Sequence, residues 1–138
     1  MQTVQDLGGM EGWQRYVDDI AGTGLVSRAC IVKTEGRKRA TSQAWMWDER
    51  EIDKLILVIE NGDVNVPALV QDSEFHIYAN DGNTAQGKTI GASVDPQVLC
   101  IGKTTEFFIV GIADGNKDNG QCVKEIQWIT DHIKNEGY

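Results

Sequence analysis

Apolar residues recur with helical spacing near both ends of the chain, and short strand-like runs lie between them. This order restricts the possible folds more than any other feature. One amphipathic helix is predicted from residue 13 to Gly22 or Gly24, and another follows a polar loop over residues 114–120. The apolar faces of these helices consist of Trp13, Tyr16, Val17 and Ile20 in the first and Cys122, Ile126, Ile129 and Ile133 in the second. Both faces must be buried against whatever the middle of the chain forms.

Short runs of β-branched and alternating residues predict strands in the middle of the sequence. These runs are residues 25–33, 39–45, 75–80, 89–94, 97–102 and 106–113. A third helix is predicted between the second and third runs, because Asp48 and Glu51 form a capping pair and Asn61-Gly62 is a stop signal. Pro67 is assigned to a loop. Successive short strands with tight turns favour an antiparallel sheet, so the predicted fold class is α+β with helices packed on that sheet.

Size and charge exclude several classes of function. The chain has 138 residues, which corresponds to one domain, and its formal net charge of −8 argues against a nucleic-acid partner. No apolar run approaches the ~20 residues of a membrane span, and residues 1–10 lack the features of a signal peptide. Three scattered cysteines argue against a disulfide framework and favour reduced thiols, with Cys100 and Cys122 as small core residues. We expect residues 1–11 to form a flexible extension and residues 12–138 a single domain.

Residues 82–89 match the G-x-x-x-x-G-K-[ST] pattern of a phosphate-binding loop, with Lys88 and Thr89 at its end. Such a loop needs a long helix directly after it, and the segment from Ile90 to Pro96 cannot form one. A glycine-rich hairpin turn is therefore favoured over a small nucleotide-binding protein.

The two histidines and three cysteines show no zinc spacing, so no metal, cofactor or catalytic site is predicted.

Aromatic residues gather toward the two ends of the chain. Trp13 and Tyr16 lie near the N-terminus, and Trp128, His132 and Tyr138 lie near the C-terminus. If the two terminal helices pack side by side, these rings line one shallow groove. Rings with polar tips suit a polyproline II helix, because proline rings stack on them while N–H and O–H groups reach the free carbonyls of the ligand. The spacing of Trp13 and Tyr16 is equally compatible with a role in the core.

Several short motifs, taken in order, resemble the profilin family of small actin-monomer-binding proteins. The segment Gly12-Trp13-Gln14-x-Tyr16-Val17-Asp18-Asp19 resembles the opening W-x-x-Y-[IV]-D motif of that family. Further matches are Ala29–Val32 with Gly36, Ala40–Trp45, Gly111-Ile112, Asn119-Gly120-Gln121-Cys122 and the closing Gly137-Tyr138. The resemblance spans residues 12–138 and is strongest at the two ends.

The resemblance implies a six- or seven-stranded antiparallel sheet. The N- and C-terminal helices would pack together on one face, with a shorter helix or helices on the other. It also implies a non-enzymatic protein that binds monomeric actin and the proline-rich segments of assembly factors such as formin-like proteins. The positions that match the polyproline groove are Trp13, Tyr16, His132 and Tyr138. The positions that match the actin surface are Val98, Lys103, Lys117, Asp118, Gly120, Val123 and Lys124.

Two residues depart from the pattern of the family. Arg39 replaces a tryptophan that often borders the groove, and Glu74 replaces a basic residue that would meet acidic actin. An alternative hypothesis is therefore a profilin-fold adaptor for proline motifs with weak or no actin binding. The family also binds phosphoinositides through basic patches, and only weak binding is expected from the single dense cluster at residues 37–39. We expect a monomer of the cytoplasm and cytoskeleton that sequesters actin monomers.

Overall fold

A seven-stranded antiparallel sheet forms the middle layer of the protein. The computed structural model describes residues 11–35, 37–90, 96–114 and 119–138. The sheet order is β2-β1-β7-β6-β5-β4-β3. The strands are β1 (Arg28–Lys33), β2 (Arg39–Thr41), β3 (Val66–Val70), β4 (Ser73–Asn80), β5 (Thr84–Thr89), β6 (Gln97–Lys103) and β7 (Phe107–Asp114). Each strand pairs antiparallel with its neighbours, as the run of short strands predicts.

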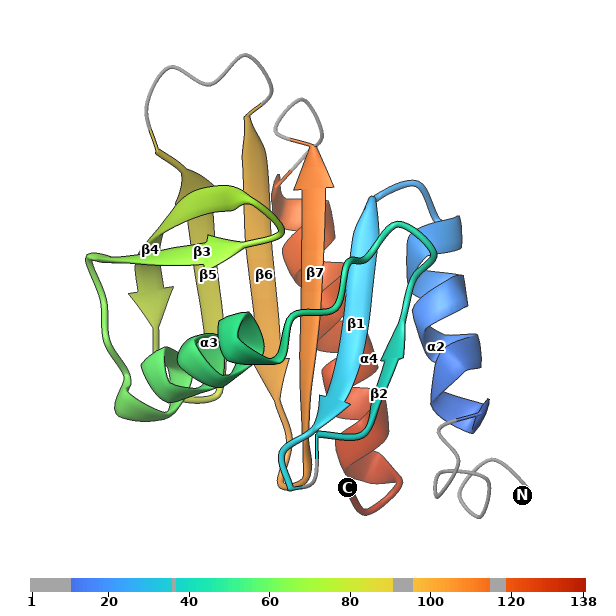
Figure 1. The fold of residues 1–138 in the computed structure, drawn as a ribbon. Helices are drawn as coiled ribbons and strands as arrows, with labels where there is room; N and C mark the ends of the chain where they lie inside the picture. The colour runs from blue at the N-terminus through green and yellow to red at the C-terminus, as the bar shows by residue number, and fades with distance from the viewer. Residues whose placement is uncertain (1–10, 36, 91–95, 115–118) are drawn as a thin grey trace.

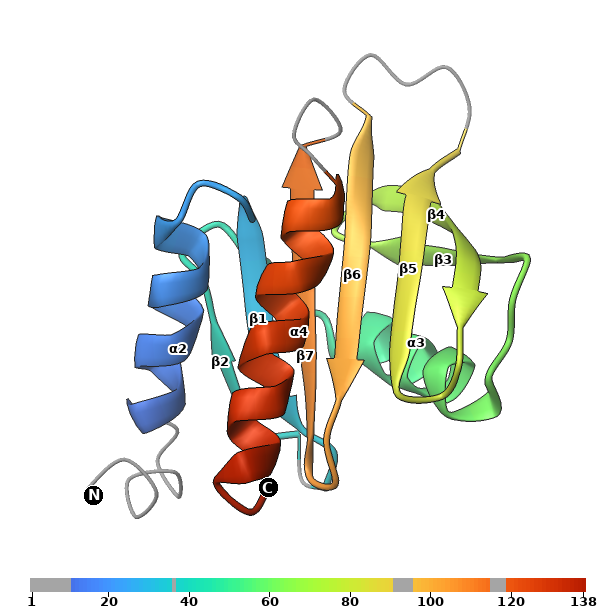
Figure 2. The same cartoon turned by 180° about the vertical axis from the view of Figure 1, so that it is seen from behind.

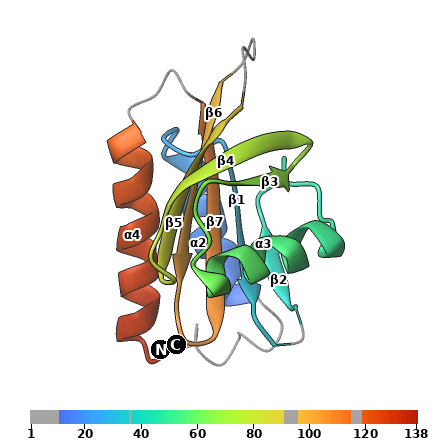
Figure 3. The same ribbon diagram turned by 90° about the vertical axis from the view of Figure 1, so that its left-hand side faces the viewer.

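Helices cover both faces of this sheet. Helix α3 (Glu49–Asn61) lies on one face, in front of the sheet in Figure 1. Helices α2 (Glu11–Gly22) and α4 (Asn119–Asn135) lie side by side on the other face (Figure 2). The edge-on view in Figure 3 shows the sheet between α4 and α3. The predicted α+β architecture, with the terminal helices together on one face, is confirmed.

Two hydrophobic cores result from this layering. The core between the sheet and helices α2 and α4 contains Trp13, Ile109 and Ile129, and the core on the α3 side contains Ile52, Phe75 and Phe108. Strand β7 contributes to both, so all of its residues except the terminal Asp114 are buried. A strand that is covered on both faces loses the polar–apolar alternation of a half-exposed strand. For this reason residues 107–113 form one continuous apolar run.

The largest differences from the predicted strands concern β2, β5 and β3. Strand β2 ends at Thr41 instead of residue 45, and β5 covers residues 84–89 instead of 89–94. Residues 91–94 of that predicted run lie outside the described part. The sequence analysis places Pro67 in a loop, whereas the structure has strand β3 at Val66–Val70. It is an edge strand that pairs only with β4, and a proline is tolerated there because its missing N–H is needed by no second neighbour.

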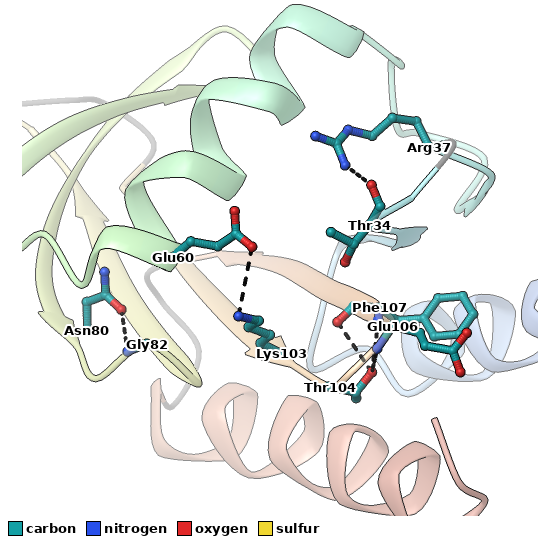
Figure 4. Close-up of polar contacts among 9 residues, drawn as sticks. All are labelled: Thr34, Arg37, Glu60, Asn80, Gly82, Lys103, Thr104, Glu106 and Phe107. Atoms are coloured by element: carbon teal, nitrogen blue, oxygen red, sulfur yellow. Dashed lines mark hydrogen bonds and ion pairs between the residues drawn. The ribbon is translucent and has the colours of Figure 1, made fainter.

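The phosphate-loop pattern forms a hairpin instead of a nucleotide site. Asp81 accepts hydrogen bonds from the backbone N–H groups of Asn83 (2.8 Å) and Thr84 (2.7 Å), which lower the pKa of its carboxyl group. Gly82 adopts a φ of 88°, and its N–H donates to the side chain of Asn80 (Figure 4). Residues 84–89 then run as strand β5 and no helix follows directly, so the loop-then-helix geometry that holds phosphates is missing there.

Helix α3 has the two ends that the sequence predicts. Asp48 caps its N-terminus by accepting from the N–H groups of Arg50 and Glu51, and Gly62 ends it with a φ of 69°. Glu51 does not complete a reciprocal capping box. Its carboxylate instead accepts from the backbone N–H of Gln71 (2.7 Å) in the β3–β4 turn, and burial raises its pKa. Helix α3 is therefore fixed to the edge of the sheet by a polar contact that the sequence pattern did not reveal.

Two kinds of feature are missing from the described part of the chain. None of its helices is both long and apolar enough to cross a membrane. Its histidine, cysteine, aspartate and glutamate side chains form no group of three that could hold a metal ion.

Helix α4 approaches β6 so closely that Gly102 has no room for a side chain. A Cβ atom built on Gly102 would lie 2.0 Å from the hydroxyl oxygen of Thr130, which donates a 2.7 Å hydrogen bond to the carbonyl of Ile126. We predict that Gly102→Ala destabilises the fold by about 1–3 kcal/mol, because the helix must shift or Thr130 must lose this bond. Gly22→Ala, where nothing lies within 4 Å, should change the free energy of unfolding by less than about 0.5 kcal/mol. Urea denaturation of both variants measures the difference, and equal stabilities would contradict this account of the helix–sheet contact.

Candidate functional site

An aromatic cluster joins the two ends of the described chain. Trp13 and Tyr16 project from α2, His132 projects from α4, and Tyr138 follows α4 at the C-terminus. The Trp13 ring lies 5.3 Å from Tyr16 and 5.6 Å from Tyr138, and the Tyr16 ring lies 5.6 Å from His132. The structure thus brings together all four residues that the sequence assigns to the polyproline groove. We call Trp13, Tyr16, His132 and Tyr138 the aromatic cluster.

Trp13 forms the floor of the aromatic cluster. Its side chain is 2% exposed and packs on Phe107 of β7 at a ring distance of 4.7 Å. Among the residues that the structure describes, the buried indole Nε1 has no hydrogen-bond acceptor. An unpaired buried donor costs free energy, and a ligand carbonyl that reaches it would recover that cost. Trp13 is therefore a core residue and, among the described residues, also a donor that lacks an acceptor. Its spacing in the sequence is compatible with a role in the core and with a role in the groove.

Tyr138 is held in place although it is the last residue. Its carbonyl accepts a 3.0 Å hydrogen bond from the N–H of Glu106, and its own N–H donates to the carbonyl of Ile133. Glu106 lies in the β6–β7 turn, which Thr104 closes by accepting from the N–H of Phe107 (Figure 4). The Tyr138 ring then stands edge-on against Trp13 and Phe107. The C-terminal ring is consequently part of the structure and packs against the Trp13 indole.

Tyr16 and His132 connect α2 to α4. The Tyr16 hydroxyl lies 3.2 Å from Nε2 of His132, and partial burial together with the charge of Glu136 raises the pKa of the Tyr16 phenol. On the outer side, the ring of Trp128 stacks on His132 at 5.4 Å and is 60% exposed. Trp128 continues the aromatic surface beyond the four residues of the cluster. Its i, i+4 spacing from His132 is the signal that places it there.

Arg39 does not border the aromatic cluster. Its guanidinium lies 4.3 Å from the ring centre of Trp47, which packs against the core on the α3 side. The neighbouring Ala40 faces the other core, as alternation along β2 requires. Arg39 therefore makes a cation–π contact, and this contact lies on the opposite face of the sheet from the aromatic cluster.

A second candidate surface lies on the sheet beside α4. Helix α4 covers β6 and β7, while β4 and β5 extend past it (Figure 2). Since Phe75 and Ile77 face α3, Glu74 and His76 face the other way, beside Lys88 of the neighbouring strand. The Lys88 ammonium lies 5.3 Å from the ring centre of Tyr78, whose hydroxyl contacts Gln86 at 2.9 Å. We call Glu74, His76, Tyr78, Gln86 and Lys88 the open sheet surface.

The structure separates the residues that the sequence assigns to the actin surface. Val98 is 5% exposed and belongs to the core on the α4 side. Lys103 lies on the α3 side, where its ammonium is 3.9 Å from the carboxylate of Glu60 (Figure 4). Gly120, Val123 and Lys124 lie at the start of α4, on the opposite side of the sheet from that ion pair. Lys117 and Asp118 fall outside the described residues.

Only part of the start of α4 borders the open sheet surface. Val123 and Gln127 line a small cavity with Thr84 and Gln86 of β5. Lys124 instead lines a shallow depression with Leu25 and Trp128, toward α2. Val123 is thus the residue of the expected set that adjoins the open sheet surface. The sequence analysis assigns neither Lys88 nor Tyr78 to the actin surface. The alternation along β4 is the signal that could have placed Tyr78 on this face of the sheet.

With this geometry established, comparison with known proteins identifies the family. The sequence model of the profilin family matches residues 11–138, so the chain belongs to the profilin family. Profilins are non-enzymatic actin-binding regulators of polymerisation as a class. A comparison with curated protein sequences finds no match.

Solved profilin structures share the fold at low sequence identity. Profilin IA of Acanthamoeba castellanii superposes with a TM-score of 0.80 and 22% identity, over 91% of this chain and 99% of that one. Profilin of Schizosaccharomyces pombe gives 0.79 and 21%, with the same coverage. Mouse profilin IIa, solved in complex with a double repeat from the FH1 domain of mDia1, gives 0.72 and 17%, over 92% of this chain and 99% of that one.

The contacts of Tyr138 lead to a prediction about stability. We predict that Tyr138→Ala lowers the free energy of unfolding by about 1–2 kcal/mol, because it removes a half-buried ring from Trp13 and Phe107. Tyr138→Phe keeps the ring and should remain within about 0.5 kcal/mol of the parent protein. Urea titrations of the two variants test this prediction. A Tyr138→Ala protein as stable as Tyr138→Phe would mean that the terminal ring does not pack in solution.

Proposed function

We propose that this chain binds proline-rich segments of actin-assembly factors through the aromatic cluster and monomeric actin through the other side of α4, and so regulates actin polymerisation. The aromatic cluster carries the proposal. Rings from both ends of the chain meet at one place, with a buried indole N–H that has no acceptor within the described ranges of the chain. Membership of the profilin family supports both activities.

The chemistry of the aromatic cluster suits a polyproline II helix. Such a helix forms no internal hydrogen bonds, so its carbonyl groups are free to accept from a protein. Tyr16, His132 and Tyr138 offer ring faces and polar tips, and Trp128 lengthens the surface. The indole N–H of Trp13 becomes available when the terminal Tyr138 ring moves aside. The FH1 repeat bound to mouse profilin IIa supports formin-like proteins as a source of such segments.

For actin, we propose a surface formed by Gly120 and Val123 at the start of α4 together with the open sheet surface. Lys88 supplies a positive charge there, and Glu74 supplies a negative one. Electrostatic complementarity at the rim of an interface acts mainly on the association rate. Glu74 should therefore reduce the affinity for an acidic partner without abolishing binding. Simultaneous binding on the two surfaces would raise the local concentration of actin monomers near a proline-rich factor.

We also propose that lipid binding is weak. In the basic cluster at residues 37–39, Arg37 donates to the carbonyl of Thr34 (Figure 4). Arg37 also pairs with the carboxylate of Asp53 at 2.7 Å, and Arg39 stacks on Trp47. Both arginines of this cluster are thus engaged within the protein. We expect the protein to act as a monomer in the cytoplasm and at the cytoskeleton.

The polyproline proposal is tested by removing one hydrogen-bond donor. We predict that Trp13→Phe weakens binding of a proline-rich peptide about 5–10-fold, the effect of losing one hydrogen bond. Both tryptophans are buried, so each substitution leaves a cavity and should lower the melting temperature, and binding is measured at a temperature where both variants are folded. Trp45→Phe is the matched control, since Trp45 also has a buried, unpaired Nε1 but lies in the core on the α3 side. Calorimetric titration measures both variants, and the proposal fails if Trp13→Phe binds as well as the parent protein or if both variants lose affinity equally.

The actin proposal is tested by reversing the charge of Glu74. We predict that Glu74→Lys tightens actin binding by about 0.5–1 kcal/mol at low salt, and that the gain shrinks as salt screens the rim. Glu35→Lys, in the β1–β2 turn, makes the same charge change away from the open sheet surface and should give no gain. Binding to monomeric actin at two ionic strengths measures the effect. A parent protein that leaves actin polymerisation unchanged even in large excess would favour the alternative, an adaptor for proline motifs alone.

A further inference from the structure

A pocket lies between helix α3 and the edge strand β3, on the face of the sheet opposite the aromatic cluster. Its volume is about 300 Å³, which is at the lower end of the range for small-molecule sites. Leu55 and Val58 of α3 and Pro67 and Leu69 of β3 give it an apolar lining. A pocket of this size and lining suits a small molecule with a short hydrocarbon part.

Hydrogen bonds fix one end of the pocket. Glu51 of its lining accepts from the backbone N–H of Gln71 at 2.7 Å. The Gln71 side chain in turn donates to the carbonyl of Met46 (2.6 Å) and accepts from the N–H of that residue (2.7 Å). These bonds tie the β3–β4 turn to α3 and to the segment before it. The pocket is therefore preformed, and a ligand does not have to order its walls.

Part of the apolar lining is open to solvent. Leu69 is 61% exposed, and a hydrocarbon chain that covered it would remove apolar surface from water. Leu57 of α3 is exposed to a similar extent, 58%, but does not line the pocket. The two leucines thus differ in their position relative to the pocket and hardly in their exposure.

Two cations line the outer side of the pocket. Arg50 and Lys54 are four residues apart on α3, so their side chains lie on the same side of the helix. Neither of them has an ion-pair partner among the described residues. Both are therefore available to an oxygen anion that enters beside the apolar lining.

Three acidic residues also line the pocket, but two of them are engaged within the protein. Asp48 accepts two backbone N–H groups as the cap of α3, and Glu51 accepts from Gln71. Asp72 is exposed in the β3–β4 turn, where solvent and salt screen its charge. The charged groups open to a ligand are thus two cations and one exposed carboxylate, which favours an anionic ligand.

We propose that this pocket binds a medium-chain fatty acid. The hydrocarbon chain lies along the apolar lining between α3 and β3, and the carboxylate pairs with Arg50 and Lys54. The site is separate from the basic cluster at residues 37–39, which does not line the pocket. It is also independent of the proposed binding of actin and proline-rich segments, because those surfaces lie on the other face of the sheet.

Calorimetric titration of the full-length protein with octanoate tests this proposal. We expect one saturable site, with an affinity that rises about 2–4-fold for each CH₂ group from hexanoate to decanoate. Octanol has the same chain without the charge and should bind about 3–10-fold more weakly, the effect of losing two exposed ion pairs. The proposal is overturned if octanoate shows no saturable binding, or if octylammonium binds as tightly as octanoate.

One pair of double variants tests the role of the two cations. Arg50→Gln with Lys54→Gln should remove the advantage of octanoate over octanol and leave the binding of octanol unchanged. Arg15→Gln with Lys134→Gln removes one arginine and one lysine from α2 and α4, on the other face of the sheet, and should keep that advantage. Equal loss in both double variants would mean that only the net charge of the protein matters, which would contradict the proposed site.

A pair of leucine variants tests the position of the hydrocarbon chain. Leu69→Asn should weaken the binding of octanoate and of octanol alike, by about 5-fold, because it removes apolar surface from the pocket. Leu57→Asn should bind both as the parent protein does. Since both leucines are exposed, we expect both variants to fold, and their melting temperatures verify this. Equal affinities of the two variants would overturn the placement of the chain between α3 and β3.

Discussion

Burial of the sheet on both faces is the constraint on which the rest of the structure depends. Strand β7 lies near the centre of this sheet and contributes side chains to both cores. Such a strand is stable only when helices cover it from each side, so α3 must pack on one face and α2 and α4 on the other. Two helices that share a single face lie next to each other. The aromatic cluster is a direct result, since it forms where the start of α2 meets the end of α4.

Much of this arrangement could be predicted from sequence because it depends on local patterns. The helical spacing of Trp13, Val17 and Ile20 defines a buried face of α2, and Asp48 and Gly62 define the ends of α3. The predictions that were wrong concern features that depend on the position of a strand within the sheet. Pro67 forbids a central strand but not an edge strand, and only the topology distinguishes them. Similarly, Gly82 and Gly87 suggest a loop, whereas Gly87 lies within a strand.

Part of the candidate site could also be predicted from sequence. All four residues of the aromatic cluster follow from family motifs at the chain ends, and the structure brings their side chains together. The placement of the residues expected at the actin surface depends on which face of the sheet each side chain of β6 points to. A short motif does not contain that information. One step along a strand moves a side chain to the other face of the sheet, so Lys103 pairs with Glu60 beside α3 while Cys100 meets α4. Tyr78 and Lys88 come together through the pairing of β4 and β5, and that register involves residues distant from any family motif.

The two outer strands limit how this sheet can grow. A second molecule that added a strand beside β2 would find only three residues to pair with. At the other edge, hydrogen-bonded and non-hydrogen-bonded pairs alternate along β3 and β4, starting from the hydrogen-bonded pair Val70–Ser73 at the turn. Pro67 belongs to a non-hydrogen-bonded pair, so its backbone nitrogen points away from β4. An incoming strand would therefore meet a position without a donor at Pro67, the second residue of β3. Pro67 therefore protects this edge of the seven-stranded sheet from edge-to-edge aggregation. The same proline is the reason that the sequence pattern indicates a loop where β3 lies.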